Sequence, residues 1–235
     1  MESHTELSDL QVHECARSDA EPFIEKWHYS HGCKGVTSSL CFRVDVDDRL
    51  VGAAVFGLPA GMGVYKKYSE DGRYKLLELR RFVMIDDLPP NNESYVLSRM
   101  LKTCREEGIE RVLSYADPAH GHQGIIYQAT GFTRLGTTSK RKHIMWNGKK
   151  YPDRNVHQTN FPYHKELRAA LESGEAERFV VPGKVIYLKD LIKPWELKRR
   201  EKVDAVRAGV SEENTLASSE ESRSQQADPA LTASA

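Results

Sequence analysis

Long hydrophobic runs are missing from this 235-residue sequence. No apolar stretch approaches the roughly 18 residues that a membrane-spanning helix requires, and the polar start does not have the pattern of a signal peptide. We therefore expect a protein that makes no membrane contact and works in the cytoplasm.

Cysteine is also scarce. The four cysteines, Cys15, Cys33, Cys41 and Cys104, form no close pair of the kind found in zinc ribbons or redox motifs. Four reduced thiols are favoured over a disulfide framework in a chain of this length. Cys104 is best interpreted as a small core residue on the apolar face of a helix.

Net charge is absent too, because 34 Lys and Arg balance 34 Asp and Glu. The distribution is nevertheless uneven. The seven cations between positions 134 and 154 face a single acid, Asp153, and they are Arg134, Lys140, Arg141, Lys142, Lys149, Lys150 and Arg154. A zero total can therefore conceal a basic surface.

The composition that remains is that of a soluble globular protein, with 39% hydrophobic and 29% charged residues. We expect a flexible amino terminus over 1–17 and a single domain over 18–192. The segment 193–235 has too few apolar residues to fold, so we expect a frayed helix and then a mostly disordered, charged tail.

The central stretch, 76–132, reads as strand, helix, strand and short helix. The long helix, over about 92–107, carries apolar residues at the i, i+3, i+4 and i+7 spacing of one buried face. Asn91 or Asn92 is expected to cap its start, and Gly108 its end. The expected strands on either side of this helix cover 76–84 and 112–116.

The flanking segments predict further elements. Ser18 and Glu21 fit the capping-box pattern at a helix start, and the alternation over 40–56 predicts a strand hairpin turning at 47–48. After the central stretch we expect one strand over 134–146, a helix over 163–172 and a terminal hairpin over 179–188. The loop at 58–63 lacks the Gly-Lys-Ser/Thr ending of a phosphate loop, and its glycines suit either a sharp turn or a passing ligand.

The order of elements in the central stretch, ending in the Tyr127–Phe132 segment, resembles the core of the GCN5-related N-acyltransferase fold. This resemblance implies an α/β fold with a mixed central sheet flanked by helices, in which two strands splay apart.

Several motifs narrow the resemblance to the Mom family of phage Mu and its relatives. They are Trp27-His28-Tyr29-Ser30, Glu78-Leu79-Arg80-Arg81, Asn92-Glu93-Ser94 and Ser114-Tyr115-Ala116-Asp117-Pro118. The resemblance implies conversion of adenine N6 in double-stranded DNA to a carbamoylmethyl adenine, which protects phage DNA from restriction. It also implies residence in the cytoplasm of a bacterial host. The alternatives are a CoA-dependent N-acyltransferase acting on a small molecule or protein, and a non-catalytic DNA-binding protein of the same fold.

Arg81 is the most informative candidate residue. Strict alternation would place it on one strand face with Leu77, Leu79 and Val83, where a bare charge is costly. It must therefore be paired, with Asp117 or Glu78, or it must clamp a substrate, as the resemblance implies.

Asp117 and Tyr127 are the other catalytic candidates within the central stretch. Asp117 follows a strand end, so it is expected either to accept a proton from the adenine amine or to cap the next segment. Tyr127 is either a proton donor to a leaving group or a core tyrosine.

His28 and Tyr29 suit the lip of a pocket, since they follow a helix and precede glycines. Metal binding has only weak candidates, His28, Asp117 and His120, because no spacing forms a metal signature. The resemblance nevertheless raises the possibility of an iron ion.

The group donor is expected at the start of the long helix, near Asn92, Ser94 and Arg81. Glu93 puts a negative charge where a pyrophosphate would lie, so an acyl- or glycyl-type donor is expected, with acetyl-CoA as a doubtful candidate.

DNA contact is expected from Lys140, Arg141, Lys142, Lys149 and Lys150. Trp146 and Tyr151 are expected to be available for stacking on a displaced base. The alternative is a solvated edge strand protected by its lysines. An enzyme acting on the adenine amine must flip that base out of the duplex. The sequence gives no indication of the oligomeric state.

Overall fold

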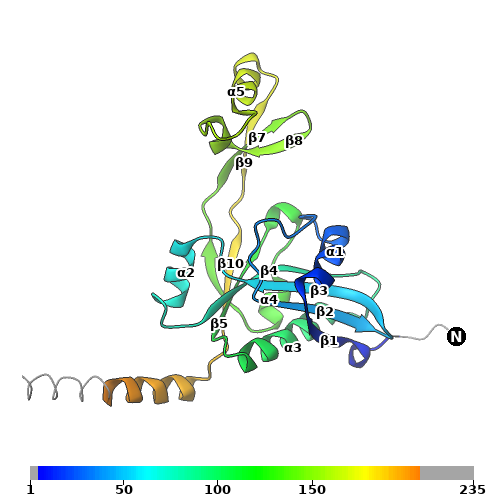
Figure 1. Cartoon of the computed structure of the whole chain (residues 1–235), viewed down its shortest axis with the longest axis vertical. Coiled ribbons are helices and arrows are strands. Elements are labelled where there is room, and N and C mark those ends of the chain that lie inside the picture. Colours follow the sequence, from blue (N-terminus) through cyan, green and yellow to red (C-terminus); the bar gives the residue numbers. More distant parts are fainter. Residues whose placement is uncertain (1–4, 207–235) are drawn as a thin grey trace, which may run out of the picture. The chain divides into compact units, whose positions relative to one another are not determined.

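The computed structural model describes residues 5–206. Its main sheet has seven strands in the order β1-β2-β3-β4-β5-β10-β6 (Figure 1). Only β4 and β5 run parallel to each other. The strands are β1 (Gln11–Cys15), β2 (Leu40–Val46), β3 (Arg49–Gly57), β4 (Leu76–Met84), β5 (Arg111–Ala116), β6 (Thr133–Thr137) and β10 (Val185–Asp190).

The parallel pair is joined over a short length only. Leu76–Glu78 of β4 pair with Arg111–Leu113 of β5, and beyond this point the two strands share no ladder. The ends of both strands are therefore free to diverge. The expected mixed sheet with two splayed strands, flanked by helices, is confirmed.

A bulge changes which side chains of β4 share a face. The pairing with β3 shifts between Val55 and Phe56, so that Val55 lies opposite Arg81 and Phe56 opposite Leu79. Arg80 is thus the extra residue of a β-bulge, which breaks the alternation. The expectation that Arg81 shares a face with Leu77 and Leu79 is therefore wrong.

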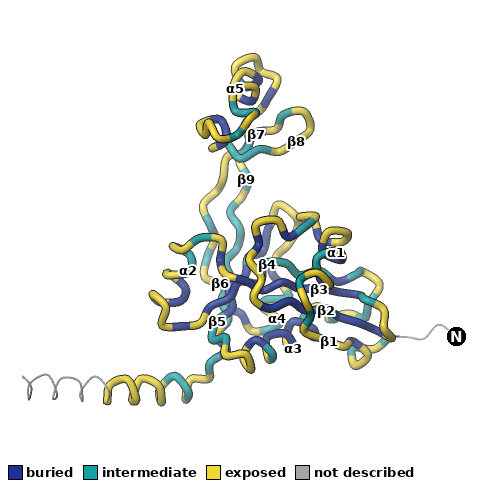
Figure 2. Tube along the Cα trace, viewed as in Figure 1, coloured by how far each residue is buried: buried dark blue, intermediate teal, exposed yellow. Residues whose placement is uncertain are grey.

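Helices cover both faces of the main sheet. Helices α1 (Arg17–Trp27) and α2 (Met62–Ser69) pack on one face, while α3 (Asn92–Glu106) and α4 (Ile125–Ala129) pack on the other. The buried face of α3 carries Val96, Leu97, Met100, Leu101 and Cys104. Figure 2 shows buried residues concentrated along the strands of this sheet.

The segment between β6 and β10 forms a small insertion with its own sheet. Its strand order is β8-β7-β9, from β7 (Arg141–Trp146), β8 (Lys149–Pro152) and β9 (Glu177–Val181). A short η3 (Asp153–Val156) and helix α5 (His164–Ser173) complete it. Its core is separate from that of the main sheet and consists of Ile144, Val156, Leu167, Ala170 and Ala176.

Two sequence expectations fail at this insertion. The residues 134–146 form two strands, β6 and β7, which belong to different sheets, and 179–188 likewise divide into β9 and β10 instead of a hairpin. Alternating residues predict a strand but do not tell which sheet it joins. The two segments that link the main sheet to the insertion lie side by side, and Thr138 N donates to Lys184 O at 2.9 Å. A Cβ on Gly183 would lie 1.8 Å from Thr138 O, so only glycine fits there.

The amino-terminal segment is more ordered than expected. After the short η1 (Leu7–Asp9), β1 forms the sheet edge against β2, and Leu10 is buried. Helix α1 begins one residue before the expected capping box, and its N-cap is Ala16, which makes no side-chain cap. Burial of Leu10 and pairing with β2 stabilise a segment whose polar composition predicted flexibility.

Of the described residues, 192–206 belong to a unit separate from residues 5–191. Residues 194–206 are helical, and the expected disordered tail lies beyond them, outside the described residues. Within 5–206, no helix is long and apolar enough to cross a membrane.

Candidate active site

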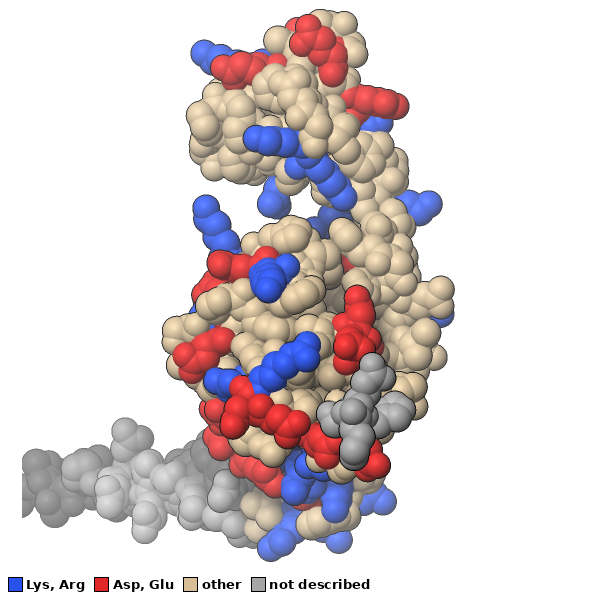
Figure 3. Space-filling view, turned by 90° about the vertical axis from the view of Figure 1, so that its right-hand side faces the viewer, with Lys and Arg blue, Asp and Glu red and all other residues tan. Residues whose placement is uncertain are grey.

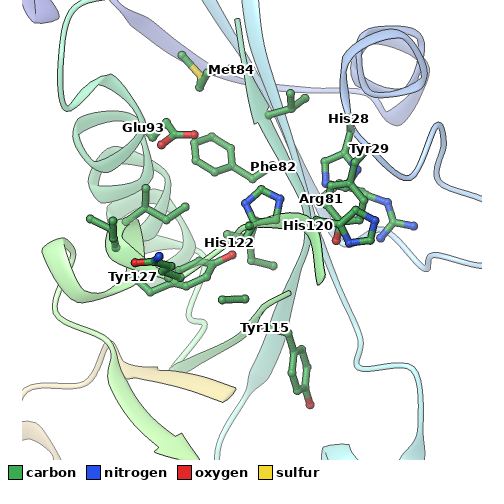
Figure 4. A pocket seen from close by; sticks show the side chains of 18 of the residues that line it. His28, Tyr29, Arg81, Phe82, Met84, Glu93, Tyr115, His120, His122 and Tyr127 are labelled. Atoms are coloured by element: carbon green, nitrogen blue, oxygen red, sulfur yellow. The ribbon is translucent and has the colours of Figure 1, made fainter. Parts of the chain in front are cut away.

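A cavity of about 770 Å³ opens where β4 and β5 diverge. Its walls come from the end of α1, from β4, the first turn of α3, the end of β5, the loop 120–124 and α4. Figure 4 shows its side chains in two groups. One group lies beside the end of α1, and the other lies beside α3 and α4.

The group beside α1 is built of stacked rings. The Tyr29 ring lies 4.3 Å from the rings of His28 and His120, measured between centroids. His28 is buried, and its Nδ1 accepts from Ser30 N at 3.1 Å. Burial and the nearby Arg81 charge lower the pKa of His28 to about 4. His28 is therefore neutral at pH 7 and carries its proton on Nε2.

Arg81 completes this group and has no acidic partner. Its Nε donates to Gly32 O at 2.9 Å and its Nη1 to Arg80 O at 2.7 Å. No ion pair within 5–206 involves Arg81, while Glu78 pairs with Arg80 at 3.3 Å. The alternative that Arg81 is neutralised by Asp117 or Glu78 is therefore wrong. Its cationic group remains available to an anionic ligand in the cavity.

The group beside α3 and α4 contains Phe82, Glu93 and Tyr127. Figure 4 shows the Tyr127 hydroxyl directed toward His122. Burial raises the pKa of Tyr127 to about 12, although the Ser114 hydroxyl opposes the shift. The phenol therefore keeps its proton at neutral pH and is a hydrogen-bond donor. Sequence reasoning did not consider Phe82, and it treated Glu93 only as a charge that excludes phosphate.

Asp117 lies outside the lining of the cavity. Its carboxylate accepts from Ala119 N at 3.1 Å, pairs with Lys184 Nζ at 2.9 Å and lies 3.5 Å from His120 Nδ1. Burial by itself raises the pKa of Asp117, but the Lys184 hydrogen bond and charge outweigh it, and the pKa falls below its ordinary value. Asp117 thus caps and anchors the loop that carries His120 and His122.

Lys184→Met is expected to destabilise the protein by about 1 kcal/mol at neutral pH, because it leaves the Asp117 carboxylate buried without its cation. The value is modest since the Lys184 side chain is 43% exposed and the pair is screened. A depressed carboxyl pKa contributes stability above the unfolded pKa, near 4, and loses it as the pH falls further. Urea unfolding should therefore show the difference at about pH 7 and a much smaller one near pH 3. An equal difference at both values would contradict the pairing.

The expected donor residues at the start of α3 do not line the cavity. Asn92 Nδ2 donates to Pro89 O at 2.9 Å and Ser94 Oγ to Asn91 O at 3.0 Å. Asn91 is the N-cap, with φ of 67°, but its side chain caps no amide. Of these first-turn residues, only Glu93 reaches the cavity.

Residues 5–206 contain no group of three His, Cys, Asp or Glu side chains that could hold a metal. Asp117 and His120 are neighbours, but the His28 Nδ1 is engaged by Ser30. The residues present do not fit an iron ion, so we derive no chemistry through one.

The five cations expected to bind DNA are exposed on the insertion. The register places Arg141 and Lys150 on the open face of its sheet, with His143 and Phe179, and Lys150 lies 5.7 Å from the Phe179 ring. Lys142 and Lys149 belong to the other face, which packs on α5. Figure 3 shows Lys and Arg side chains projecting from the lower part of this lobe.

Trp146 and Tyr151, the two aromatic residues expected to be available for stacking on a base, are half-buried. Both pack against the core of the insertion, where their rings lie 5.9 Å apart. The open face instead presents Phe179, with the His143 ring 6.0 Å away.

Comparison with solved structures finds acetyltransferases of low sequence identity. A GNAT family acetyltransferase from Elizabethkingia anophelis with acetyl-CoA bound is 10% identical, with a TM-score of 0.46, over 77% of this chain and 98% of that one. An agmatine N-acetyltransferase mutant in its apo form is 10% identical, with a TM-score of 0.48, over 77% and 99%.

Sequence comparison gives the family. Methylcarbamoylase mom of Escherichia phage Mu is 40% identical over 63 residues, which is 26% of this chain and 26% of that protein. The alignment thus spans about a quarter of the length of this curated relative. The model of the Mom protein family matches residues 9–204, which include the main sheet, the cavity and the insertion. The chain therefore belongs to the Mom protein family.

Proposed function

We propose that this protein modifies adenine N6 in double-stranded DNA, adding a carbamoylmethyl group that protects a phage genome from restriction. The observation that carries the proposal is the cavity between the splayed strands, with an unpaired Arg81 on one side and Tyr127 and Glu93 on the other. The family match supports DNA modification, and the related phage Mu protein bears the name of a methylcarbamoylase. The proposed site of action is the host cytoplasm.

The cavity suits a reaction between two ligands. Arg81, together with the neutral His28, offers donors to an anionic or carbonyl oxygen of a small molecule. Phe82 and Tyr127 offer aromatic surface to a base, and a DNA base can reach them only after it is flipped from the duplex. Tyr127 then gives its proton to the group that leaves the donor.

The donor is proposed to be an activated acyl- or glycyl-type compound. A coenzyme A pyrophosphate does not fit the first turn of α3, because Glu93 and Asp86 line that part of the cavity and carry negative charge. We therefore derive no step through acetyl-CoA.

DNA is proposed to dock on the insertion. The exposed cations there suit phosphate contacts, which hold a duplex without reading its sequence. The open face of the insertion sheet, with Arg141, Lys150 and Phe179, is the proposed docking surface.

The test is expression in a bacterium followed by mass spectrometry of nuclease-digested DNA. Deoxyadenosine with an added mass of a carbamoylmethyl group is expected, and Arg81→Leu should reduce it at least tenfold, since the clamp on the donor is removed. A Lys102→Leu variant on the exposed side of α3 serves as the control. The proposal would be contradicted if DNA from cells expressing this protein stayed unmodified while a phage Mom protein modified DNA in a parallel culture.

A further inference from the structure

Glu93 is the one carboxylate of the first turn of α3, and it faces the cavity (Figure 4). It makes no ion pair and no hydrogen bond within 5–206, whereas Glu78 and Asp117 are both paired with cations. A carboxylate that has no partner of its own in a cavity is free to accept hydrogen bonds from a ligand.

The surroundings of Glu93 are aromatic and apolar. Phe82 and Met84 come from the same face of β4, and Tyr127 comes from α4 on the same side of the cavity as Glu93. Figure 4 shows the Glu93 carboxylate next to Phe82. Glu93 is partly exposed to solvent at the cavity, but the partial desolvation of its carboxylate still raises its pKa, an effect that His122 opposes. The carboxylate is thus a better proton acceptor than an ordinary surface glutamate.

The two ends of the cavity therefore differ in charge. The α1 side offers the Arg81 guanidinium, and the α3 side offers Glu93 with aromatic rings. An adenine has a flat π face and an exocyclic amine that donates hydrogen bonds, and carboxylates accept from such amines. The chemistry of the α3 side matches the base, and that of the α1 side matches an anionic or carbonyl group.

We propose that Glu93 recognises the exocyclic amine of the flipped adenine and removes its proton, while Phe82 stacks on the base. The proposal rests on the proposed function. As the amine nitrogen forms a bond to the methylene carbon of the donor's carbamoylmethyl group, the bond from that methylene carbon to its leaving group breaks. The leaving group departs with the bonding electrons and takes the Tyr127 proton, and the N6 proton passes to Glu93.

Asp117, the carboxylate singled out by the sequence, is less suited to this role. Its oxygens are occupied by Lys184 and the Ala119 amide, and it does not line the cavity. Its lowered pKa also makes it the weaker base.

The first experiment measures modified adenine in DNA from cells that express Glu93→Gln. We expect a loss of at least a hundredfold, as general-base removal typically gives, with unchanged affinity for duplex DNA. Asp87→Asn is the matched control, because Asp87 is an exposed acid nearby that does not line the cavity. If the unaltered protein modifies DNA and Glu93→Gln, expressed in the same way, modifies it fully, the role of Glu93 is overturned while the proposed function stands.

The second experiment needs neither donor nor duplex. Saturation-transfer NMR should detect binding of deoxyadenosine to the unaltered protein in preference to deoxyinosine. The O6 of deoxyinosine is a hydrogen-bond acceptor, as is the Glu93 carboxylate, so the two oxygens repel each other. Glu93→Gln should reverse the preference, because an amide donates to O6, and Phe82→Ala should reduce both signals. Absence of deoxyadenosine binding, or an unchanged preference in Glu93→Gln, would overturn the recognition. If the unaltered protein left the genome unmodified while Glu93→Gln reversed the preference, adenine recognition by Glu93 would stand and the proposed reaction would be contradicted.

Discussion

Tyr127→Phe is expected to abolish DNA modification, with a loss of about a hundredfold or more, while DNA binding and folding are retained. The change removes one oxygen and keeps the ring that packs 5.4 Å from Phe132 and 5.1 Å from Tyr187. Because the pKa of Tyr127 is raised to about 12, the phenol holds its proton until the leaving group takes it. Modified-base yield and duplex affinity should be measured on the same preparations.

The control for this prediction is Tyr115→Phe. Tyr115 also lines the cavity, and its pKa is likewise raised to about 12 by burial, but Figure 4 shows its hydroxyl directed away from Tyr127 and Glu93. Modification that survives in Tyr127→Phe at a level similar to Tyr115→Phe would show that the Tyr127 oxygen takes no part in the reaction.

Replacement of Arg141 and Lys150 together by uncharged residues is expected to weaken duplex binding for all sequences. Both side chains are on the open face of the insertion sheet, where they can reach phosphates at the same time. The log–log dependence of affinity on salt should become shallower by about 0.9 for each phosphate that the variant no longer neutralises, or roughly 2 for the pair. Binding measured at four or more salt concentrations gives this slope.

The matched control removes the same charge from the other face. Lys142 and Lys149 lie on the side of the sheet that packs on α5, so their joint replacement should change the slope by less. If the two double variants behaved alike, the insertion would act through its total charge, and its open face would not be the docking surface.

The sequence predicted most elements of the main sheet because their periodicity is local. The splay of β4 and β5 and the helix α3 followed from the family resemblance and from apolar spacing. What failed depends on pairing at long range. The bulge at Arg80 is created by β3, and the two sheets that share the stretch 134–146 can be told apart only by their partners.

The candidate site was predicted in part for the same reason. His28, Tyr29, Arg81 and Tyr127 were expected and do line one cavity. Asp117 is adjacent to it, but Lys184, which is 67 positions later, occupies its carboxylate. Phe82 and Glu93 were missed as residues that line the cavity, because neither a strand pattern nor a helix start shows that a side chain points into an opening between strands.

The two strands that carry the insertion, β6 and β10, are antiparallel neighbours in the main sheet. The chain therefore leaves and re-enters at adjacent points, with Thr138 and Lys184 hydrogen-bonded to each other. Such an attachment has the geometry of a long hairpin loop, in which the length between the two ends can change without altering the strand order. A shorter or different segment in place of residues 139–183 would therefore leave unchanged the strand order of the main sheet and the lining of the cavity, none of which comes from this segment.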